Sequence, residues 1–436
     1  MDTIYALATP PGRSGIAIIR LSGPKSLAAL RQLSGLESVT PRMAYYAALR
    51  QSAENIIDQG LTVYFKAPHS FTGEDVVELH MHGSLAVIRE LLAALSGING
   101  LRPAEPGEFS RRAFINGKMD LMEAEGLADL IEADTSAQKT QAMRQMQGEL
   151  SAFYDRLRTG VPECLAYLEA TIDFPDEDIP EAVLMALSRQ INDIQSLIVR
   201  ALHDQKRGER LREGLHVVIL GAPNAGKSSL INALSGRNAA IVSARAGTTR
   251  DIIEIHMDIA GFPVILADTA GLRESADDIE EEGVRRALAR AAEADLRLVL
   301  IDGEEWPRID PASQELLGEQ AVMIVTKADL LHNASGQDVL FISTKTGQGM
   351  PSLLAELERR IVMFFTAESA PFITRNRHRA LLSEALKHLE NSLKTVPLEL
   401  KCEELRLAVN AIGKITGKIQ VDDVLEVIFK QFCIGK

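Results

Sequence analysis

The chain is 436 residues long, with 46% apolar residues and a formal net charge of −13. This length suggests about three domains, and the apolar fraction is sufficient to build their cores. The negative charge excludes a surface that coats nucleic acid throughout, so any RNA contact would need a local basic patch. The 3 cysteines form no C-x-x-C pair, which excludes a disulfide scaffold and a zinc finger and favours a reducing compartment. Without a signal-peptide pattern or an apolar run of about 18 residues, we expect a cytoplasmic protein with no membrane segment.

Residues 1–118 have the pattern of a compact α+β domain. Strands are predicted at 15–21, 61–66 and 75–82, and one helix is predicted near 84–95. Within the third strand Glu78, His80 and His82 lie on one face, because strand side chains repeat every second residue. These three side chains could contribute to a metal site that still lacks a further ligand, line a polar pocket, or belong to a plain exposed strand.

Strand patterns disappear from residue 119 to 212, where helical periodicity dominates, and helical spacing returns from 366 to 436. Because helices flank 213–365 on both sides, we expect this middle segment to be inserted into one helical domain. Two unrelated helical pieces are the alternative. The flanks also carry basic residues that could form an RNA-binding patch or be solvated helix ends: Lys206, Arg207, Arg210, Arg212, Arg375, Arg377 and Arg379.

A phosphate-binding loop opens the middle segment. The strand-like run 215–220 leads into Gly-Ala-Pro-Asn-Ala-Gly-Lys-Ser at 221–228, which fits G-x-x-x-x-G-K-[ST], and a helix-like run follows. In such a loop, backbone N–H groups converge on phosphate oxygens, and the N-terminus of the following helix favours the anion. Lys227 is expected to bridge the β- and γ-phosphates, and the Ser228 hydroxyl is expected to bind Mg²⁺.

Three downstream segments indicate that the nucleotide is GTP. The strand-like run 263–267 ends in Asp-Thr-Ala-Gly at 268–271, which places a carboxylate near Mg²⁺ and a glycine amide near the γ-phosphate. Thr249, in Gly-Thr-Thr-Arg at 247–250, is the candidate switch hydroxyl that reaches Mg²⁺ when the γ-phosphate is present. After the run 321–325, Asp329 can accept two hydrogen bonds from guanine, a donor pair that adenine lacks.

The glutamine that orients the attacking water in Ras-type enzymes is missing, because Leu272 occupies its position. Another group must therefore orient water and neutralise charge. Asn224 could supply an oxygen ligand to a monovalent cation beside the phosphates, together with backbone carbonyls of residues 243–248. An amide that caps the loop is the alternative interpretation of Asn224.

The middle segment resembles the Ras-like translation-factor GTPases, with two departures. Those proteins carry asparagine at the position of Thr326 and Ser-Ala-Lys at 343–345, where this chain has Ser-Thr-Lys. A threonine hydroxyl replaces only part of the hydrogen bonding of an asparagine amide. The departure therefore bears on nucleotide affinity more than on the choice of base.

Further segments are distinctive: Ala-Thr-Pro-Pro-Gly-Arg at 8–13, Phe-Thr-Gly-Glu-Asp at 71–75, Pro-Gly-Glu-Phe-Ser at 106–110, Ile-Asp-Phe-Pro-Asp at 172–176 and Phe-Cys-Ile-Gly-Lys at 432–436. With them, the chain resembles the tRNA-modification GTPase MnmE (TrmE) family along its whole length. The resemblance implies a multidomain α+β and α/β protein. Its expected parts are an α+β folate-binding and dimerisation domain at 1–118, a helical domain at 119–212 and 366–436, and an inserted Ras-like P-loop GTPase domain at 213–365.

The resemblance also implies the reaction. We expect a homodimeric, potassium-dependent GTP hydrolase that works with the FAD-dependent partner MnmG (GidA). Together they would modify C5 of the wobble uridine in tRNA with a one-carbon unit from 5-formyl-tetrahydrofolate or a related folate. The implied folate contacts are Arg20, Glu78, Lys118 and Lys436. The chemistry agrees, since a cation can hold the glutamate tail of folate and a carboxylate can pair with pterin N–H groups.

The implied catalytic groups are Lys227, Glu280 and Cys433. Glu280 would orient water, although Glu281 and Glu282 could replace it if the register is off by one, and a solvated acidic run is the other interpretation. Cys433 would be a reactive thiol or a buried structural cysteine.

The expected ligands follow from the motifs and the resemblance together. Mg²⁺ would be held by Ser228, Thr249 and Asp268, and K⁺ by Asn224, Ser243, Arg245 and Thr248. The expected GTP contacts are Asn224, Ala225, Gly226, Lys227, Ser228, Ser229, Ser243, Thr248, Thr249, Asp268, Thr269, Ala270, Gly271, Lys327, Asp329 and Ser343.

A second class of function stays open at this stage. The chain could be a non-catalytic switch whose GTP state regulates binding to RNA or to an assembling ribosomal particle. The N-terminal domain distinguishes the two hypotheses, because a pure ribosome-binding switch has no use for a folate pocket.

Overall fold

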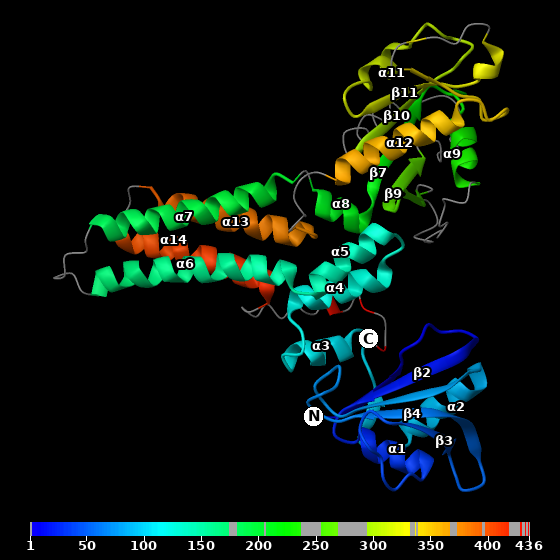
Figure 1. Ribbon diagram of the computed structural model, residues 1–436, viewed down its shortest axis with the longest axis vertical. Helices are drawn as coiled ribbons and strands as arrows, with labels where there is room; N and C mark the ends of the chain where they lie inside the picture. The colour runs from blue at the N-terminus through cyan, green and yellow to red at the C-terminus, as the bar shows by residue number, and fades with distance from the viewer. Residues whose placement is uncertain are drawn as a thin grey trace, which may run out of the picture. The chain divides into compact units, whose positions relative to one another are not determined.

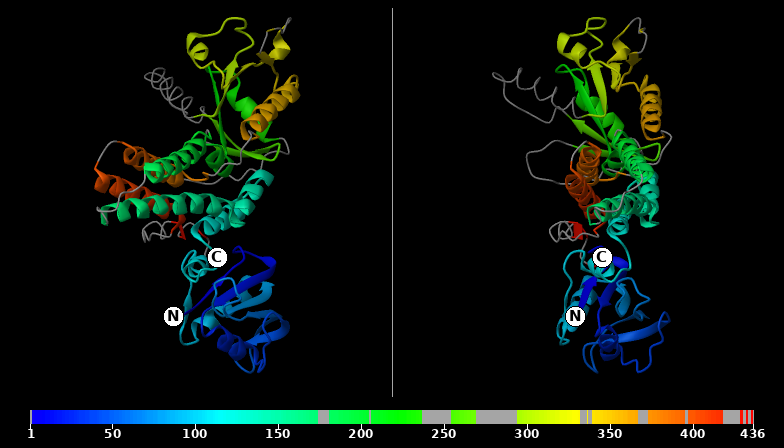
Figure 2. Two further views of the ribbon diagram at one scale, coloured as in Figure 1. Left: turned by 60° about the vertical axis from the view of Figure 1, so that its left-hand side comes forward. Right: turned by 90° about the vertical axis from the view of Figure 1, so that its left-hand side faces the viewer.

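The computed structural model describes the chain except for residues 1, 174–180, 205, 237–253, 269–293, 332–335, 337–338, 367–372, 395–396, 418–427, 430–431, 433–434 and 436. The chain divides into two compact units, which Figures 1 and 2 show with their helices and strands. The first comprises Met1–Ala128, Gln145–Asp155 and Ile412–Lys436, and the second comprises Asp129–Arg144 and Arg156–Ala411.

A 6-stranded sheet forms the centre of the first unit, in the order β3-β4-β5-β2-β1-β6. Its strands are β1 (Thr3–Leu7), β2 (Ser14–Ser22), β3 (Ala44–Arg50), β4 (Ile56–Phe65), β5 (Val76–Gly83) and β6 (Leu101–Pro103). All neighbours are antiparallel except β1 and β6, which are parallel. Helices α1 (Ser26–Ser34) and α2 (Leu85–Ser96) supply leucines to one buried cluster with Ile19, Leu21 and Leu79 of the sheet. The opposite face carries Arg20 and Glu78, which are directly paired across β2 and β5.

The expectation of a single helix in residues 1–118 is wrong, because α1 and α3 (Glu108–Ile115) accompany α2. Helix α1 has only 9 residues and ends at Gly35, whose φ of 72° is left-handed. Strand β1 was also missed: four successive residues, Thr3 to Ala6, are buried, so the strand lacks the alternation that marks a half-buried strand. Short elements and fully buried strands carry the weakest periodic signal.

Helices dominate the segments before and after the second sheet in sequence, as predicted from the periodicity. They are α4 (Leu121–Glu132), α5 (Ser136–Met146), α6 (Glu149–Asp173), α7 (Glu181–Leu202), α8 (Arg207–Glu213), α13 (Asn376–Ser392) and α14 (Leu398–Thr416). Helices α7 and α13 pack together, although the second sheet separates them in sequence (Figure 1). Arg379 of α13 also donates to the carbonyl oxygen of Leu202 at the end of α7, at 2.7 Å. Helices that precede and follow residues 213–365 are therefore in contact, and the insertion of this segment into one helical domain stays a prediction.

The proposed basic patch does not form a free cationic surface. Four of its arginines form ion pairs with carboxylates: Arg210 with Asp295, Arg212 and Arg375 with Asp129, and Arg379 with Asp204 and Glu209. The paired guanidinium groups are largely buried, with 13 to 24% of each side chain exposed. Both the RNA-patch and the solvated-helix-end interpretations are therefore wrong for these four side chains. Among the described helices, none is long and apolar enough to cross a membrane.

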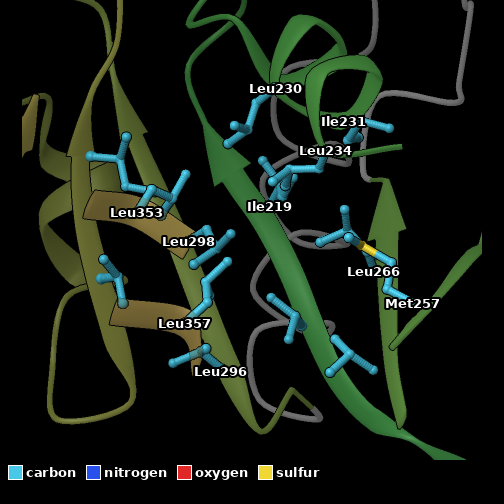
Figure 3. Packing of buried hydrophobic residues seen from close by; sticks show 14 of the residues in the cluster. Ile219, Leu230, Ile231, Leu234, Met257, Leu266, Leu296, Leu298, Leu353 and Leu357 are labelled. Carbon is cyan, nitrogen blue, oxygen red and sulfur yellow. The ribbon is translucent and has the colours of Figure 1, made fainter. Parts of the chain in front are cut away.

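The second unit contains the other 6-stranded sheet, in the order β12-β11-β10-β7-β9-β8. Its strands are β7 (Leu215–Gly221), β8 (Glu254–Ile259), β9 (Phe262–Asp268), β10 (Leu296–Ile301), β11 (Ala321–Val325) and β12 (Val339–Phe341). All neighbours are parallel except β8, which is antiparallel to β9. Helices α9 (Lys227–Ser235) and α12 (Met350–Phe365) bury one face of this sheet, and Figure 3 shows Leu230, Leu353 and Ile219 among the residues of this cluster. A second cluster around Val218 and Val299 covers the other face, as parallel sheets require.

The tight turn of the β8–β9 hairpin is attached to α5. Ala260 and Gly261 form the turn with φ values of 54° and 85°. The backbone N–H of Ala137 in α5 donates to the carbonyl oxygen of Gly261 at 3.0 Å. A Cβ atom at Gly261 would lie 2.6 Å from the Ser136 hydroxyl oxygen, and the φ of 85° is one that residues other than glycine rarely adopt, so glycine is favoured at this position. The hairpin and the helix therefore meet through backbone atoms.

Candidate functional site

The predicted phosphate-binding loop lies between β7 and α9, at the carboxyl end of a central parallel strand. This is the edge at which ligands bind in open α/β sheets. Three loop residues have positive φ angles: Gly221 at 144°, Asn224 at 66° and Gly226 at 85°. A Cβ atom at Gly221 would lie 2.3 Å from the carbonyl oxygen of Leu300 in β10, so the strand passes its neighbour too closely for any other residue. These turns bend the backbone into a loop ahead of the helix N-terminus.

Lys227 curls back over this loop. Its ammonium group donates to the carbonyl oxygens of Gly221 and Ala222, both at 2.8 Å. The side chains of Ser228 and Ser229 follow in the first turn of α9 and are exposed. The loop therefore presents an ammonium group and two hydroxyls at a helix N-terminus, an arrangement that suits a polyphosphate.

Asn224 is exposed at the tip of the loop. Among the described residues, its side chain has no hydrogen-bond partner, so no described loop group is capped by its amide. Its left-handed backbone, with φ of 66°, places a polar side chain at the tip where a glycine would be the easier choice. The potassium role of Asn224 stays a prediction.

Thr326 replaces the expected asparagine and reaches the phosphate-binding loop. Its hydroxyl lies 2.9 Å from the carbonyl oxygen of Ala225 and 3.2 Å from that of Ile301, and the residue is buried. The backbone N–H of Thr326 also donates to the carbonyl oxygen of Ile301 at 2.9 Å. Thr326 is therefore connected to the end of β10 through both groups and to the phosphate-binding loop through its hydroxyl. The Thr326 hydroxyl thus links the Thr326–Asp329 segment to the phosphate loop.

Asp329, the predicted guanine reader, is exposed beside Ser343. A hydrogen bond from the Ser343 side chain holds the pKa of the Asp329 carboxyl below its usual range, so the carboxylate is charged at neutral pH. Ser343 itself is 1% exposed, and its hydroxyl also accepts from the backbone N–H of Thr346 at 3.2 Å. The buried Ser343 side chain is therefore hydrogen-bonded to the exposed Asp329 carboxylate.

Two acidic residues beside Lys327 were not singled out from the sequence. The Lys327 ammonium lies 2.6 Å from Asp302 Oδ2 and 3.6 Å from Glu304 Oε1. Both follow β10, the parallel neighbour of β11. The rule that ligands bind at the carboxyl ends of parallel strands is the signal that could have drawn attention to them.

The part of the chain that the structure describes holds only some of the predicted site. Asp268 ends β9, but its side chain is outside the described residues. Ser228 is the one predicted Mg²⁺ ligand whose side chain is described. The predicted residues that lie outside are Ser243, Arg245, Thr248, Thr249, Thr269, Ala270, Gly271, Glu280 with its alternatives Glu281 and Glu282, Cys433 and Lys436.

Arg20 and Glu78, predicted as folate contacts, form an ion pair in the first unit. Arg20 Nη2 lies 2.9 Å from Glu78 Oε1, and about four-fifths of each side chain is buried. The guanidinium carbon lies 5.4 Å from the ring centre of Phe71 and 5.9 Å from that of Phe109. His80 Nε2 contacts the other carboxylate oxygen of Glu78 at 3.2 Å. This cluster combines charge, aromatic surface and hydrogen-bonding groups.

The other two predicted folate residues are placed differently. Lys118 is exposed, and its aliphatic stem packs close to Gly73, which lies two residues beyond Phe71 in sequence. A Cβ atom added at Gly73 would be 3.2 Å from that stem. Lys436 is outside the described residues, but the carbonyl oxygen of its neighbour Gly435 lies 3.5 Å from Arg20 Nη1. The C-terminal tail therefore reaches the Arg20 cluster.

The metal interpretation of Glu78, His80 and His82 is wrong. Among the described residues, no group of three or more His, Cys, Asp or Glu side chains is arranged to hold a metal ion. Nδ1 of His82 instead lies 2.9 Å from Asp58 Oδ1, and Glu78 is occupied by Arg20 and His80. These contacts account for the alternating polar residues of β5.

The parallel sheet, the glycine-bounded loop with Lys227 and the Thr326 to Asp329 segment define a P-loop GTPase of the Ras-like fold, joined here to an α+β domain and helices. Residues 3–118 match the family model "GTP-binding protein TrmE N-terminus", and residues 121–433 match the model "MnmE helical domain". The chain belongs to the MnmE family.

Curated relatives match from end to end. The "tRNA modification GTPase MnmE" of Paramagnetospirillum magneticum is 50% identical over 100% of both chains. The protein of that name from Parvibaculum lavamentivorans is 51% identical, again over 100% of both chains. Among solved structures, the G domain of the T. maritima FeoB iron transporter is 26% identical and covers 34% of this chain and 98% of that chain, with a TM-score of 0.25.

Proposed function

We propose that this chain hydrolyses GTP and acts in the modification of tRNA. The proposal rests on relatives named tRNA modification GTPase, which are 50% and 51% identical in sequence to this chain over its full length. The phosphate loop of this chain also has the lysine, Lys227, that the motif requires. In finer detail, we propose modification at C5 of the wobble uridine with a folate one-carbon unit, together with the FAD-dependent partner MnmG.

The geometry of the loop supports GTP as the ligand. Lys227 can exchange its two carbonyl acceptors for phosphate oxygens without leaving the loop, and Asp329 can take the guanine edge. Ser228, Thr249 and Asp268 would hold Mg²⁺. A bound magnesium ion neutralises charge on the β- and γ-phosphates. Leu272 cannot orient water, and the resemblance to the family gives this role to Glu280, or to Glu281 or Glu282 if the register differs.

We further propose that Asn224, Ser243, Arg245 and Thr248 hold K⁺, which would add positive charge beside the phosphates. The exposed Asn224 amide, uncommitted among the described residues, supports this role. GTP turnover should then be faster in potassium than in sodium buffer at equal ionic strength, measured as released phosphate. Asn224→Ala should remove the difference while GDP binding persists. Equal turnover of the unmodified protein in both salts would contradict the potassium role.

The Arg20 cluster supports folate binding. A cation flanked by two aromatic rings, with a carboxylate beside it, can bind the negatively charged tail and the N–H groups of a folate. Lys118 and Lys436 would add cations from the Gly73 side and from the tail. Titration of the protein with 5-formyl-tetrahydrofolate tests this step, and heat release unchanged by Arg20→Ala would count against it.

Association into a homodimer is supported by the sheet face that carries the Arg20 cluster. Tyr46 is 70% exposed and its cross-strand partner Leu61 is 47% exposed. Leu61 in turn pairs with His80, so apolar and folate-related side chains share one face. Exposed neighbouring apolar side chains of this size are typical of a surface that another protein covers. Sedimentation of the protein without nucleotide gives its mass directly, and a monomer would contradict the dimer.

The decisive experiment for the function is nucleoside mass spectrometry of tRNA from cells with and without this protein. Cells that lack the protein should lose the C5-modified wobble uridine, and the wild-type gene should restore this modification. A matched strain that carries Lys227→Ala should fail to restore it. Intact modification in the deletion strain would instead favour the GTP-regulated binding switch.

A further inference from the structure

The turn that follows β10 packs directly against the base-reading segment. Asp302 begins this turn, and its Oδ1 accepts from the backbone N–H of Glu304 at 3.0 Å. A Cβ atom at Gly303 would lie 2.4 Å from the carbonyl oxygen of Thr326, so the two backbones touch. The Asp302 side chain is only 12% exposed. Its carboxylate therefore has a fixed position next to Lys327.

Lys327 is held at both ends. Its backbone has a left-handed φ of 53°, and its ammonium lies 2.6 Å from Asp302 Oδ2. The ion pair raises the pKa of Lys327, so the group stays charged across the physiological range. Between these ends, the four-carbon stem has little freedom left, and a third of the side chain is exposed.

We propose that Asp302 is a positioning residue for the guanine nucleotide, because it holds Lys327 with its aliphatic stem ready to pack against the base that Asp329 reads. The inference rests on the proposed GTP binding. A free lysine side chain must be ordered when a ligand packs on it, and this ordering opposes binding. An ion pair already formed in the empty protein removes that entropy loss from the binding step.

The variant that tests the role is Asp302→Asn. Its amide oxygen can still accept from the Glu304 N–H, so the turn is retained, but the charge that holds the lysine is removed. Loss of one lysine's pre-ordering should weaken GDP binding by about tenfold, mainly through faster dissociation of a fluorescent GDP analogue. Glu304→Gln is the matched control, because Glu304 is 63% exposed and 3.6 Å from the ammonium. Its affinity for GDP should stay within about twofold of the unmodified protein.

A double-mutant cycle separates positioning from general disturbance of the loop. In a Lys327→Met background, Asp302→Asn should cause no further loss of GDP affinity, because the group that it positions is gone. The ratio of GDP to IDP affinity should also stay constant, since the stem faces the base plane and Asp329 reads the base edge. GDP binding unaffected by Asp302→Asn, or an equal loss in the Lys327→Met background, would overturn the inference. Failure of the unmodified protein to bind GDP would instead refute the proposed function.

Discussion

Lys227→Ala is expected to lower kcat/KM for GTP hydrolysis by about a hundredfold to a thousandfold, the usual effect of removing one charged or hydrogen-bonding group from a transition state. The ammonium of Lys227 lies over the phosphate loop, 2.8 Å from two of its carbonyl oxygens. In the transition state, charge builds up on the phosphate oxygens that replace those carbonyls. Alanine removes one of the cations that would balance that charge.

Phosphate release from purified protein measures this effect, and Lys227→Arg is the informative companion. Arginine keeps the positive charge but lacks the compact ammonium that contacts the loop carbonyls, so its rate should fall between those of the wild-type protein and the alanine variant. Thermal melting of each variant shows whether the loop still folds once its carbonyl contacts are lost. Turnover of the alanine variant at the original rate would remove Lys227 from the proposed site.

Arg379→Met is expected to lower the free energy of unfolding by about 3–5 kcal/mol, because it leaves two buried carboxylates without a positively charged partner. Arg379 donates to Glu209 and Asp204 at 2.6 Å each and to the Leu202 carbonyl oxygen at 2.7 Å. The Glu209 and Asp204 side chains are only 2% and 6% exposed. Methionine fills much of the space but cannot compensate either charge, so the helices around the GTPase segment lose their central ion pair.

Urea unfolding followed by circular dichroism at 222 nm measures this loss as a lower midpoint. Arg406→Met is the matched control, because Arg406 pairs with Glu169 on the surface and its side chain is 55% exposed. Its midpoint should stay close to that of the unmodified protein. Equal midpoints for the two variants would show that burial of the Arg379 pairs contributes nothing to stability.

The phosphate loop could be predicted from the sequence because its constraints are local. A strand, two glycines and Lys227 within one short segment leave few other conformations available, and the structure has the strand, the loop and the helix in the expected places. The link from Thr326 to Ala225 is different, since the two residues lie 101 positions apart. Nothing in either local pattern indicates that the ends of β7, β10 and β11 meet there. The contact of Asp302 with Lys327 was missed for the same reason.

The pattern of basic residues in the sequence does not predict their ion pairs. A run such as Arg210 to Arg212 looks like a cationic surface when only the sequence is available. Its partners Asp295 and Asp129 lie 85 and 83 positions away in sequence. Tertiary packing determines whether such a charge faces water or a carboxylate, and the packing is not visible in the run itself.

The attachment of the β8–β9 turn to α5 has a mechanical consequence. The hairpin runs from Glu254 to Asp268, so its open end is the end at which Asp268, a proposed Mg²⁺ ligand, stands, and its closed end lies at α5. The two strands are hydrogen-bonded to each other along their length, and Gly261 at their turn lies against Ser136 and Ala137 of α5. A shift of the hairpin along its strands would therefore strain or break the hydrogen bond between Gly261 and Ala137 unless α5 moves with it.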